Sequence, residues 1–231
     1  MTRLTNARLA GFTYLFYIAV AFPGMVLFGR ATDAQGTSAK LARLAEHALD
    51  VRIAIVLGIL SCFSAVVLGV ALYGVTRDED RDLALIALGC RLAEGITGAT
   101  GTLMTVALLW LATATGPNAP DATAAMGLAA TLLKMGGSNT TVAATFFAVG
   151  STIFCSLLLR GRMIPLWLAW LGVGGSALLA VVLPLQLAGY FRGPTAQLIW
   201  IPIAVFELTV AVWLLVKGVA PPRHAVRGEA I

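Results

Sequence analysis

The chain has 231 residues, of which 59% are hydrophobic and only 12% are charged. About a quarter of the residues are charged in a typical soluble domain, so this composition excludes a soluble globular protein and indicates an integral membrane protein. The formal net charge of +5 is scattered over short connections without a basic face. This pattern favours membrane topology, rather than nucleic-acid binding, as the origin of the charge.

Continuous apolar runs predict a polytopic, all-α transmembrane bundle, because barrel strands would show a two-residue alternation. A span needs ~20 apolar residues, which leaves room for about six spans and for no sizeable soluble domain. In chain order we expect spans over 9–28, 53–75, within 83–111, within 138–159, 163–187 and 198–219. Together they form a single membrane-embedded domain over residues 1–231, with 219–231 as a short cytoplasmic tail.

Basic residues near the span ends predict the orientation. Six spans place both termini on one side, and basic residues are more frequent on that side, at Arg3, Arg8, Arg77, Arg81, Arg160, Arg162, Lys217, Arg223 and Arg227. The opposite side carries Arg30, Lys40, Arg43, Arg52, Lys134 and Arg192. We therefore expect both termini in the cytoplasm, in a multi-pass protein of the cell membrane.

Two connections on the outer side are longer than a tight turn requires. Residues 35–50 place Leu41, Leu44, Ala45 and Leu49 at helical spacing, which predicts an amphipathic helix on the surface of the bundle. Residues 112–137 open with the turn sequence TATGPNAPD and continue with MGLAATLLKMGG. The second part predicts another short interfacial helix.

Three ionisable residues interrupt the spans: Arg91 and Glu94 in the third and Glu207 in the sixth. Such charges cost free energy in a bilayer, so they normally face the bundle interior and mark a functional site. By helical rise, Glu94 lies about 18 Å from Asp82. Glu207 lies about 15 Å from Lys217, at the same membrane face. Arg91 shares one side of its helix with Glu94, and all three are expected to meet near the midplane if the third and sixth spans are neighbours.

One guanidinium neutralises only one carboxylate in full, so the second carboxylate is expected to hold a proton in this low-dielectric site. A protonated acid can act as a general acid, as the proton carrier of a transporter or as a hydrogen-bond donor. Arg91, Glu94 and Glu207 are therefore the candidate catalytic residues. A purely structural bridge between the two spans is an equal alternative, because structural ion pairs also perturb protonation.

Small residues thin one surface of the third span, at Gly89, Gly95, Gly98 and Gly101. Such a surface normally lets a neighbouring helix approach closely, which is the favoured interpretation. The alternative is a groove for an apolar chain beside Glu94, with candidate substrate-binding residues Gly95, Gly98, Tyr14 and Tyr17. A similar patch, GVGGSALLA, begins at Gly172 and is also interpreted as packing.

Metal and cofactor chemistry has little support in the sequence. Cys62, Cys90 and Cys155 lie within spans, without CxxC spacing or a nearby histidine. Phosphate loops, dinucleotide fingerprints, Ser/His/Asp arrangements and Asp-rich diphosphate motifs are all missing. We expect no metal and no cofactor, and as partners the lipid bilayer and a hydrophobic small-molecule substrate, with no nucleic acid.

Five ordered motifs carry a family resemblance. They are RLAGFTYLFYIAV from Arg8, ALYG from Ala71, RLAEG from Arg91, LLLRGRMIPLWLAWLG from Leu157 and FELTVAVWLLVKGV from Phe206. With these motifs the chain resembles the bacterial membrane-protein family catalogued as domain of unknown function 4386. The similarity covers nearly the whole chain and supports the architecture, but the family name implies no reaction.

The resemblance also bears on single positions. Arg52, Arg91, Glu94 and Glu207 match polar positions of the family pattern. Two positions depart from it, since Gly58 stands where an aspartate is expected and Gly150 where a histidine is expected. If those polar groups belong to the usual activity of the family, this member has a different one.

Three function classes remain open. The first is a metal-independent membrane enzyme whose buried acid acts on a lipid-like or isoprenoid substrate, for example in proton-initiated terpenoid cyclisation. The second is a small proton-coupled transporter, disfavoured because neither inverted repeats nor matched broken helices are evident. The third is a non-catalytic accessory or regulatory membrane protein. The convergence of the charges at one depth, without a polar path across the bilayer, favours the enzyme.

Overall fold

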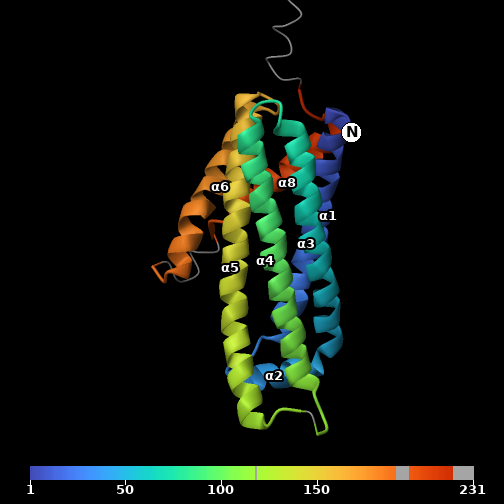
Figure 1. Cartoon of the computed structure of the whole chain (residues 1–231), viewed down its shortest axis with the longest axis vertical. Helices are drawn as coiled ribbons and strands as arrows, with labels where there is room; N and C mark the ends of the chain where they lie inside the picture. The colour runs from blue at the N-terminus through green and yellow to red at the C-terminus, as the bar shows by residue number, and fades with distance from the viewer. Residues whose placement is uncertain (118, 191–197, 221–231) are drawn as a thin grey trace, which may run out of the picture. The chain divides into compact units, whose positions relative to one another are not determined.

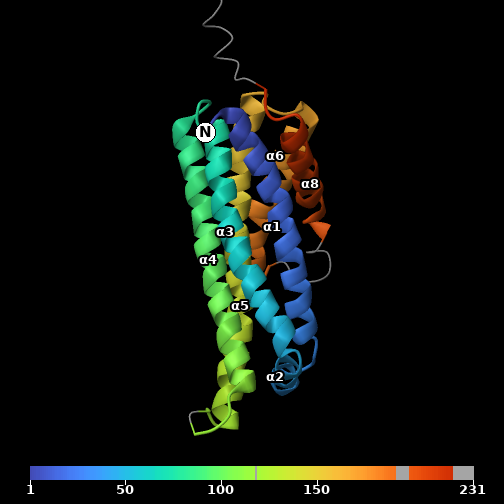
Figure 2. The ribbon, with the colours of Figure 1, turned by 90° about the vertical axis from the view of Figure 1, so that its right-hand side faces the viewer.

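The computed structural model describes residues 1–117, 119–190 and 198–220. Every regular element in these ranges is a helix. The elements are α1 (Arg3–Ala31), α2 (Thr37–Glu46), α3 (Ala48–Thr76), α4 (Arg81–Thr113), α5 (Ala122–Arg160), α6 (Leu166–Leu187) and α8 (Ile201–Val216) (Figures 1 and 2). The prediction of an all-α polytopic bundle is confirmed.

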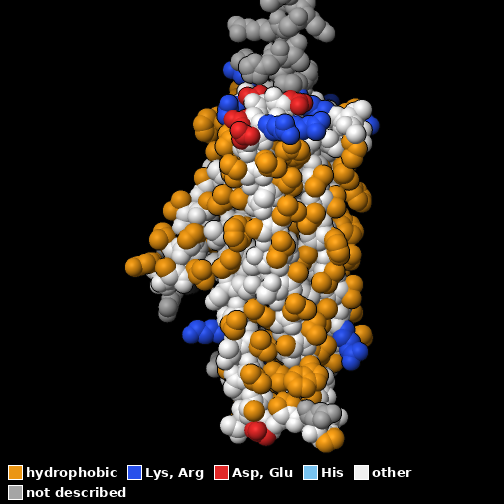
Figure 3. All heavy atoms as spheres, viewed as in Figure 1, with side chains coloured by type: hydrophobic (Ala, Val, Ile, Leu, Met, Phe, Trp, Pro, Cys, Tyr) orange, Lys and Arg blue, Asp and Glu red, His pale blue; other side chains and the backbone are white. Residues whose placement is uncertain are grey.

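Five of the described helices, α1, α3, α4, α5 and α6, are long and apolar enough to cross a membrane. Hydrophobic side chains cover the visible sides of the helices (Figure 3). Large ones such as Phe22, Phe63 and Trp170 are more than 60% exposed. Apolar surface on this scale is typical of helices that face lipid. The chain is therefore a multi-pass membrane protein.

The sixth predicted span corresponds to the shorter helix α8. Its 16 residues extend about 24 Å at the α-helical rise, which is less than the ~30 Å hydrocarbon core. Pro202 stands in the first turn of α8, where its fixed φ suits a helix start and its missing N–H costs nothing. The count of six spans, the cytoplasmic termini and the cell membrane stay predictions.

The chain forms two compact units. Unit 1 comprises residues 1–16, 63–95 and 141–231, and unit 2 comprises residues 17–62 and 96–140. The helices α1, α3, α4 and α5 each contribute one part to each unit. A single domain over 1–231 stays a prediction, and most of its expected tail, 221–231, lies outside the described residues.

In unit 1, helices α6 and α8 pack side by side. Glycines make this close approach possible, because a Cβ atom on Gly172 would lie 2.6 Å from the ring of Phe206, and one on Gly175 would lie 3.1 Å from the backbone nitrogen of Ile203. Phe206 and Ile203 are buried in the core of the unit. The patch that begins at Gly172 therefore serves helix packing, as the sequence predicts.

Ion pairs join helix ends in unit 1. The guanidinium of Arg160, at the end of α5, lies 3.8 Å from the carboxylate of Glu79 and 3.5 Å from that of Asp80 in the turn between α3 and α4. Asp80 also accepts a hydrogen bond from the backbone N–H of Leu83 at 3.1 Å and so caps α4. These contacts fix the α3–α4 turn to the end of α5.

In unit 2, the predicted amphipathic helix over 35–50 is present as α2, but it ends at Glu46. His47 leaves helical geometry, with φ −100° and ψ 29°, and α3 begins at the next residue. Leu44 is fully buried in a small core with Ala31 and Val51. Leu49 belongs to α3 and is 70% exposed, so its expected place on the apolar face of α2 is wrong.

The separate interfacial helix expected over 126–137 is also wrong. Residues 122–160 form one continuous helix, α5, of 39 residues. The carboxylate of Asp121 accepts hydrogen bonds from the backbone N–H groups of Thr123 and Ala124, both at 2.9 Å, and this cap sets the start of α5. No proline follows to end the helix, and the pair Gly136 and Gly137 remains helical.

The role of Gly172 in packing is testable with a matched pair of variants. Gly172→Ala places a methyl group against Phe206 and Cys155, and we expect it to lower unfolding stability by about 1–3 kcal/mol through overpacking. Gly174→Ala, two residues away, meets no atom within 4 Å and should be neutral or slightly stabilising. Thermal unfolding in detergent, followed by tryptophan fluorescence, measures both. Equal melting temperatures for the two variants would refute this packing role.

Candidate functional site

Four helices of unit 1 surround one buried arginine. Arg91 and Glu94 lie on α4, and the other members of the group, which we call the Arg91 cluster, are Tyr14 on α1, Phe147 and Ser151 on α5, and Glu207 on α8. The structure thus brings the three predicted catalytic residues into one neighbourhood. It adds Phe147 and Ser151, which the sequence analysis missed.

The central contact of the cluster is the ion pair between Arg91 and Glu94. Nη1 of Arg91 donates to Oε2 of Glu94 at 2.8 Å. The two residues stand one helical turn apart, so their side chains share one side of α4. Only 1% of the Arg91 side chain and 6% of the Glu94 side chain are exposed. A pair buried to this degree is strongly destabilised when one partner is removed.

Three further groups satisfy the guanidinium of Arg91. Nη2 donates to the hydroxyl of Ser151 at 3.2 Å. The ring of Phe147 lies 4.7 Å below the guanidinium carbon in a cation–π contact. The hydroxyl of Tyr14 lies near enough to interact with the guanidinium electrostatically. Within the described residues, only Nε of Arg91 is buried without a hydrogen-bond partner in this cluster.

The surroundings of Glu207 differ from those of Glu94. Its charge acts on Arg91 and Tyr14 through space. Among residues 1–117, 119–190 and 198–220, however, its carboxylate enters no ion pair. Glu207 is half-buried, with buried Phe206 before it and exposed Leu208 after it. Among the described residues, the cluster therefore holds one buried carboxylate in an ion pair and one half-buried carboxylate without one.

Glycines on α3 and α5 let these helices pack closely against α4 around Arg91. A Cβ atom on Gly69 of α3 would lie 2.7 Å from Cβ of Arg91. One on Gly150 of α5 would lie 3.0 Å from Cβ of Cys90. Because both helices approach α4 this closely, the long side chain of Arg91 is enclosed by protein rather than by lipid.

The four-residue spacing of Phe147 and Ser151 is the sequence feature that could have identified them. Phe147 and Ser151 stand four residues apart on α5, and Cys155 follows at the same interval. Residues four apart share one helix face, so this stripe faces Arg91 as a set. A serine on a helix face that otherwise carries a phenylalanine and a buried cysteine indicates that this face meets a polar group inside the bundle.

The predicted substrate-binding residues divide between the two units. Tyr14 and Gly95 belong to unit 1, where both are buried. Tyr17 and Gly98 belong to unit 2. A Cβ atom on Gly98 would lie 3.1 Å from Sγ of Cys62 on α3, which agrees with a packing role for this glycine. A role of these four residues in substrate binding stays a prediction.

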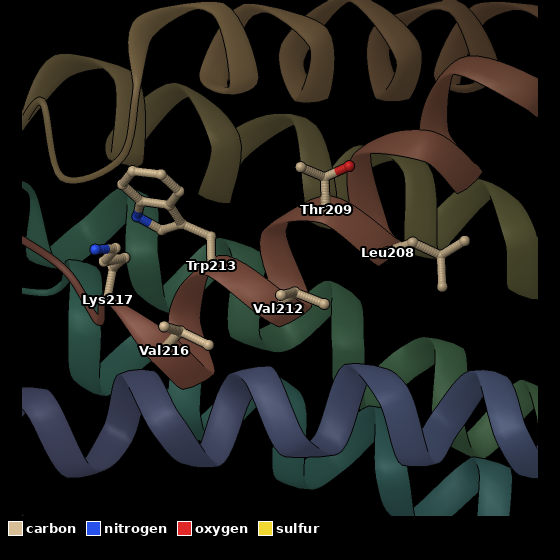
Figure 4. A pocket seen from close by; sticks show the side chains of 6 residues that line it. All are labelled: Leu208, Thr209, Val212, Trp213, Val216 and Lys217. Atoms are coloured by element: carbon tan, nitrogen blue, oxygen red, sulfur yellow. The ribbon is translucent and has the colours of Figure 1, made fainter.

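Among the described residues, no three His, Cys, Asp or Glu side chains gather into a group that could hold a metal ion. Two grooves open on unit 1 beside α8, and Figure 4 shows the lining of the first; neither is lined by Arg91, Glu94 or Glu207. The chemistry that the cluster offers is therefore that of one guanidinium, two carboxylates and two hydroxyl groups.

A family model described as a domain of unknown function, DUF4386, matches residues 9–218. The chain belongs to this family. No curated protein and no solved structure matches the chain. Apart from the first residues of α1, the DUF4386 match covers the helices of both units and the whole Arg91 cluster, and it names no reaction.

The two positions that depart from the expected family pattern are close helix contacts in this DUF4386 member. A Cβ atom on Gly58 would lie 2.9 Å from the hydroxyl of Thr102 on α4. Gly150 meets Cys90 and the backbone of Ala87 on the same helix. Aspartate or histidine at these positions would require the contacting atoms of α4 to shift.

The energetic unit formed by Arg91 and Glu94 can be measured with a double-mutant cycle. Arg91→Met leaves the carboxylate of Glu94 buried without its cation, and we expect a loss of about 3–5 kcal/mol in unfolding stability. Adding Glu94→Gln to that variant removes the orphaned charge and should restore part of the loss. Thermal unfolding of both single variants and of the double variant gives the coupling energy. Additive effects would show that the two charges do not depend on each other.

Proposed function

We propose that this protein is a membrane-embedded enzyme in which Glu207 donates a proton to an apolar, lipid-like or isoprenoid substrate. The observation that carries the proposal is the charge count of the Arg91 cluster. Two carboxylates share one guanidinium, and Glu94 already pairs with it at 2.8 Å. The excess negative charge is balanced if Glu207 binds a proton, which makes it the acid of the pair.

Access favours the same assignment. Glu94 is 6% exposed, whereas Glu207 is half-buried beside the lipid-exposed Leu208. An apolar molecule that enters from the bilayer therefore reaches Glu207 first.

The proposed reaction is a proton-initiated isomerisation or cyclisation. The proton of Glu207 adds to one carbon of a C=C bond, whose electron pair forms the new C–H bond. The resulting carbocation is captured by a second C=C bond, which closes a ring. Loss of a proton to the carboxylate of Glu207 then regenerates the acid. Arg91 stabilises that carboxylate while the proton is away, and neither metal nor redox partner is consumed.

A non-catalytic packing role is the second candidate, and the tight fit around Arg91 favours it. Gly69 and Gly150 let two helices close over a guanidinium that already has Glu94, Ser151 and Phe147 as partners. A cluster built only for packing has no need of a proton on Glu207. The two candidates therefore differ in the state of this one residue.

Infrared spectroscopy of the reconstituted protein at neutral pH tests the protonation of Glu207. We expect a C=O stretching band of a protonated carboxylic acid in the wild type and in Gly174→Ala, and its loss in Glu207→Gln. Thr209→Val, on the same helix, is a matched control that should keep the band. A band that persists in Glu207→Gln would show that the proton resides elsewhere and would remove the proposed acid.

The reaction itself is tested with isoprenoid alkenes of several chain lengths, supplied in lipid vesicles made in deuterated water. We expect an isomeric product that carries deuterium at one carbon, and loss of that product in Glu207→Gln, with Thr209→Val as the active control. Mass spectrometry measures both isomerisation and deuterium content. Equal product formation by wild type and Glu207→Gln would overturn the proposal, and a spectroscopic proton without any turnover would favour a non-catalytic role.

A further inference from the structure

Two adjoining grooves follow α8 on the surface of unit 1. The first has a volume of about 490 Å³ and is lined by Leu208, Thr209, Val212, Trp213, Val216 and Lys217 (Figure 4). The second has a volume of about 400 Å³ and is lined by residues 162–165, between α5 and α6, together with Trp213 and 217–220. Because they share Trp213 and Lys217, we treat them as one feature, the α8 groove.

The first part of the α8 groove is apolar and elongated. Leu208, Val212 and Val216 stand four residues apart on one face of α8, and each is about half exposed or more. From Leu208 to Lys217 the helix rises about 14 Å, close to the ~15 Å depth of one hydrocarbon leaflet. This part of the groove thus has the length and the lining that suit a single acyl chain.

The second part of the groove is cationic. Lys217 and Arg162 both line it and both are exposed. Arg160, two residues before Arg162, forms ion pairs with Glu79 and Asp80. Within the described residues, by contrast, neither Lys217 nor Arg162 takes part in an ion pair. The two cations are therefore available to an anion from outside the chain.

The backbone at Arg162 supports a role for its side chain. Arg162 has φ 49°, a left-handed conformation that usually selects glycine at a helix C-terminus. Arginine at this position costs conformational energy that a glycine would avoid. Trp213, at the junction of the two parts, has the amphipathic ring that is enriched at membrane interfaces, and Figure 4 shows it beside Lys217.

We propose that the α8 groove binds an anionic phospholipid. One acyl chain lies along Leu208, Val212 and Val216, and the phosphate lies between Lys217 and Arg162. The two parts of the groove follow each other as the parts of a lipid do. The apolar part is about as long as one leaflet is deep, and it ends at the part that contains the two cations. This site is separate from the Arg91 cluster and does not depend on the proposed reaction.

The test compares phosphatidylglycerol with phosphatidylcholine of identical acyl chains. The full-length protein is freed of lipid in detergent and titrated with each lipid, and bound lipid is counted by native mass spectrometry. We expect the wild type to prefer phosphatidylglycerol. The double variant Lys217→Gln, Arg162→Gln should lose roughly thirtyfold in affinity for it, since each cation near an anionic headgroup contributes about fivefold. Its affinity for phosphatidylcholine, whose choline offsets the charge of the phosphate, should fall much less.

Two controls make the outcome specific. Arg81→Gln removes an exposed cation from the start of α4, which lines neither part of the groove, and it should leave the preference unchanged. Glycerol phosphate, which has no acyl chain, should not displace phosphatidylglycerol. An unchanged preference in the double variant, an equal loss in Arg81→Gln, or displacement by glycerol phosphate would each overturn the proposal. So would a groove occupied by a second copy of the chain, seen as a dimer that Val212→Trp separates.

Discussion

The burial of the positive charge of Arg91 is the constraint that organises unit 1. A guanidinium inside a membrane protein must be paired and hydrogen-bonded, or its desolvation is prohibitive. Glu94 supplies the opposite charge, Ser151 a hydroxyl group and Phe147 a π face. Ser151 and Phe147 come from α5, so they reach Arg91 only if α5 approaches α4 closely, and the tight contacts of Gly150 with Cys90 and Ala87 favour a small residue at that position. The interactions that stabilise the charge of Arg91 therefore depend on the close packing of α5 against α4.

Much of this arrangement could be predicted from the sequence, because the strongest membrane signals are local. Apolar runs give the helices, and the rarity of charges within them identifies Arg91, Glu94 and Glu207. Counting helical rise from Asp82 and Lys217 places all three at one depth without knowledge of the neighbours. That estimate agrees with the through-space electrostatic interaction of Arg91 with Glu207. The sequence analysis assumed, and did not derive, that the third and sixth spans are neighbours, which the three residues need in order to meet.

The features that the sequence did not predict depend on contacts between distant helices or on the conformation of single residues. Ser151 and Phe147 look like ordinary span residues until α5 is placed against Arg91. The start of α5 at Ala122 depends on the side-chain cap of Asp121, whereas hydropathy reports only the part of a helix that is apolar. The break at His47 separates α2 from α3 by a single residue, and no proline or glycine marks it. The packing role of the small-residue patches, by contrast, could be predicted, because such patches usually mark close contacts between helices.

Glu94 and Glu207 are the same residue type and both interact with Arg91, but the fold gives them different surroundings. Glu94 stands one turn from Arg91 on the same helix, so its pairing is set by local geometry and survives any movement between helices. Glu207 approaches Arg91 from another helix and shares no ion pair among the described residues. Its interaction with the cation varies with the distance between α4 and α8. In the proposed reaction the proton on Glu207 is therefore coupled to helix position, whereas the packing role, our second candidate, needs no such coupling.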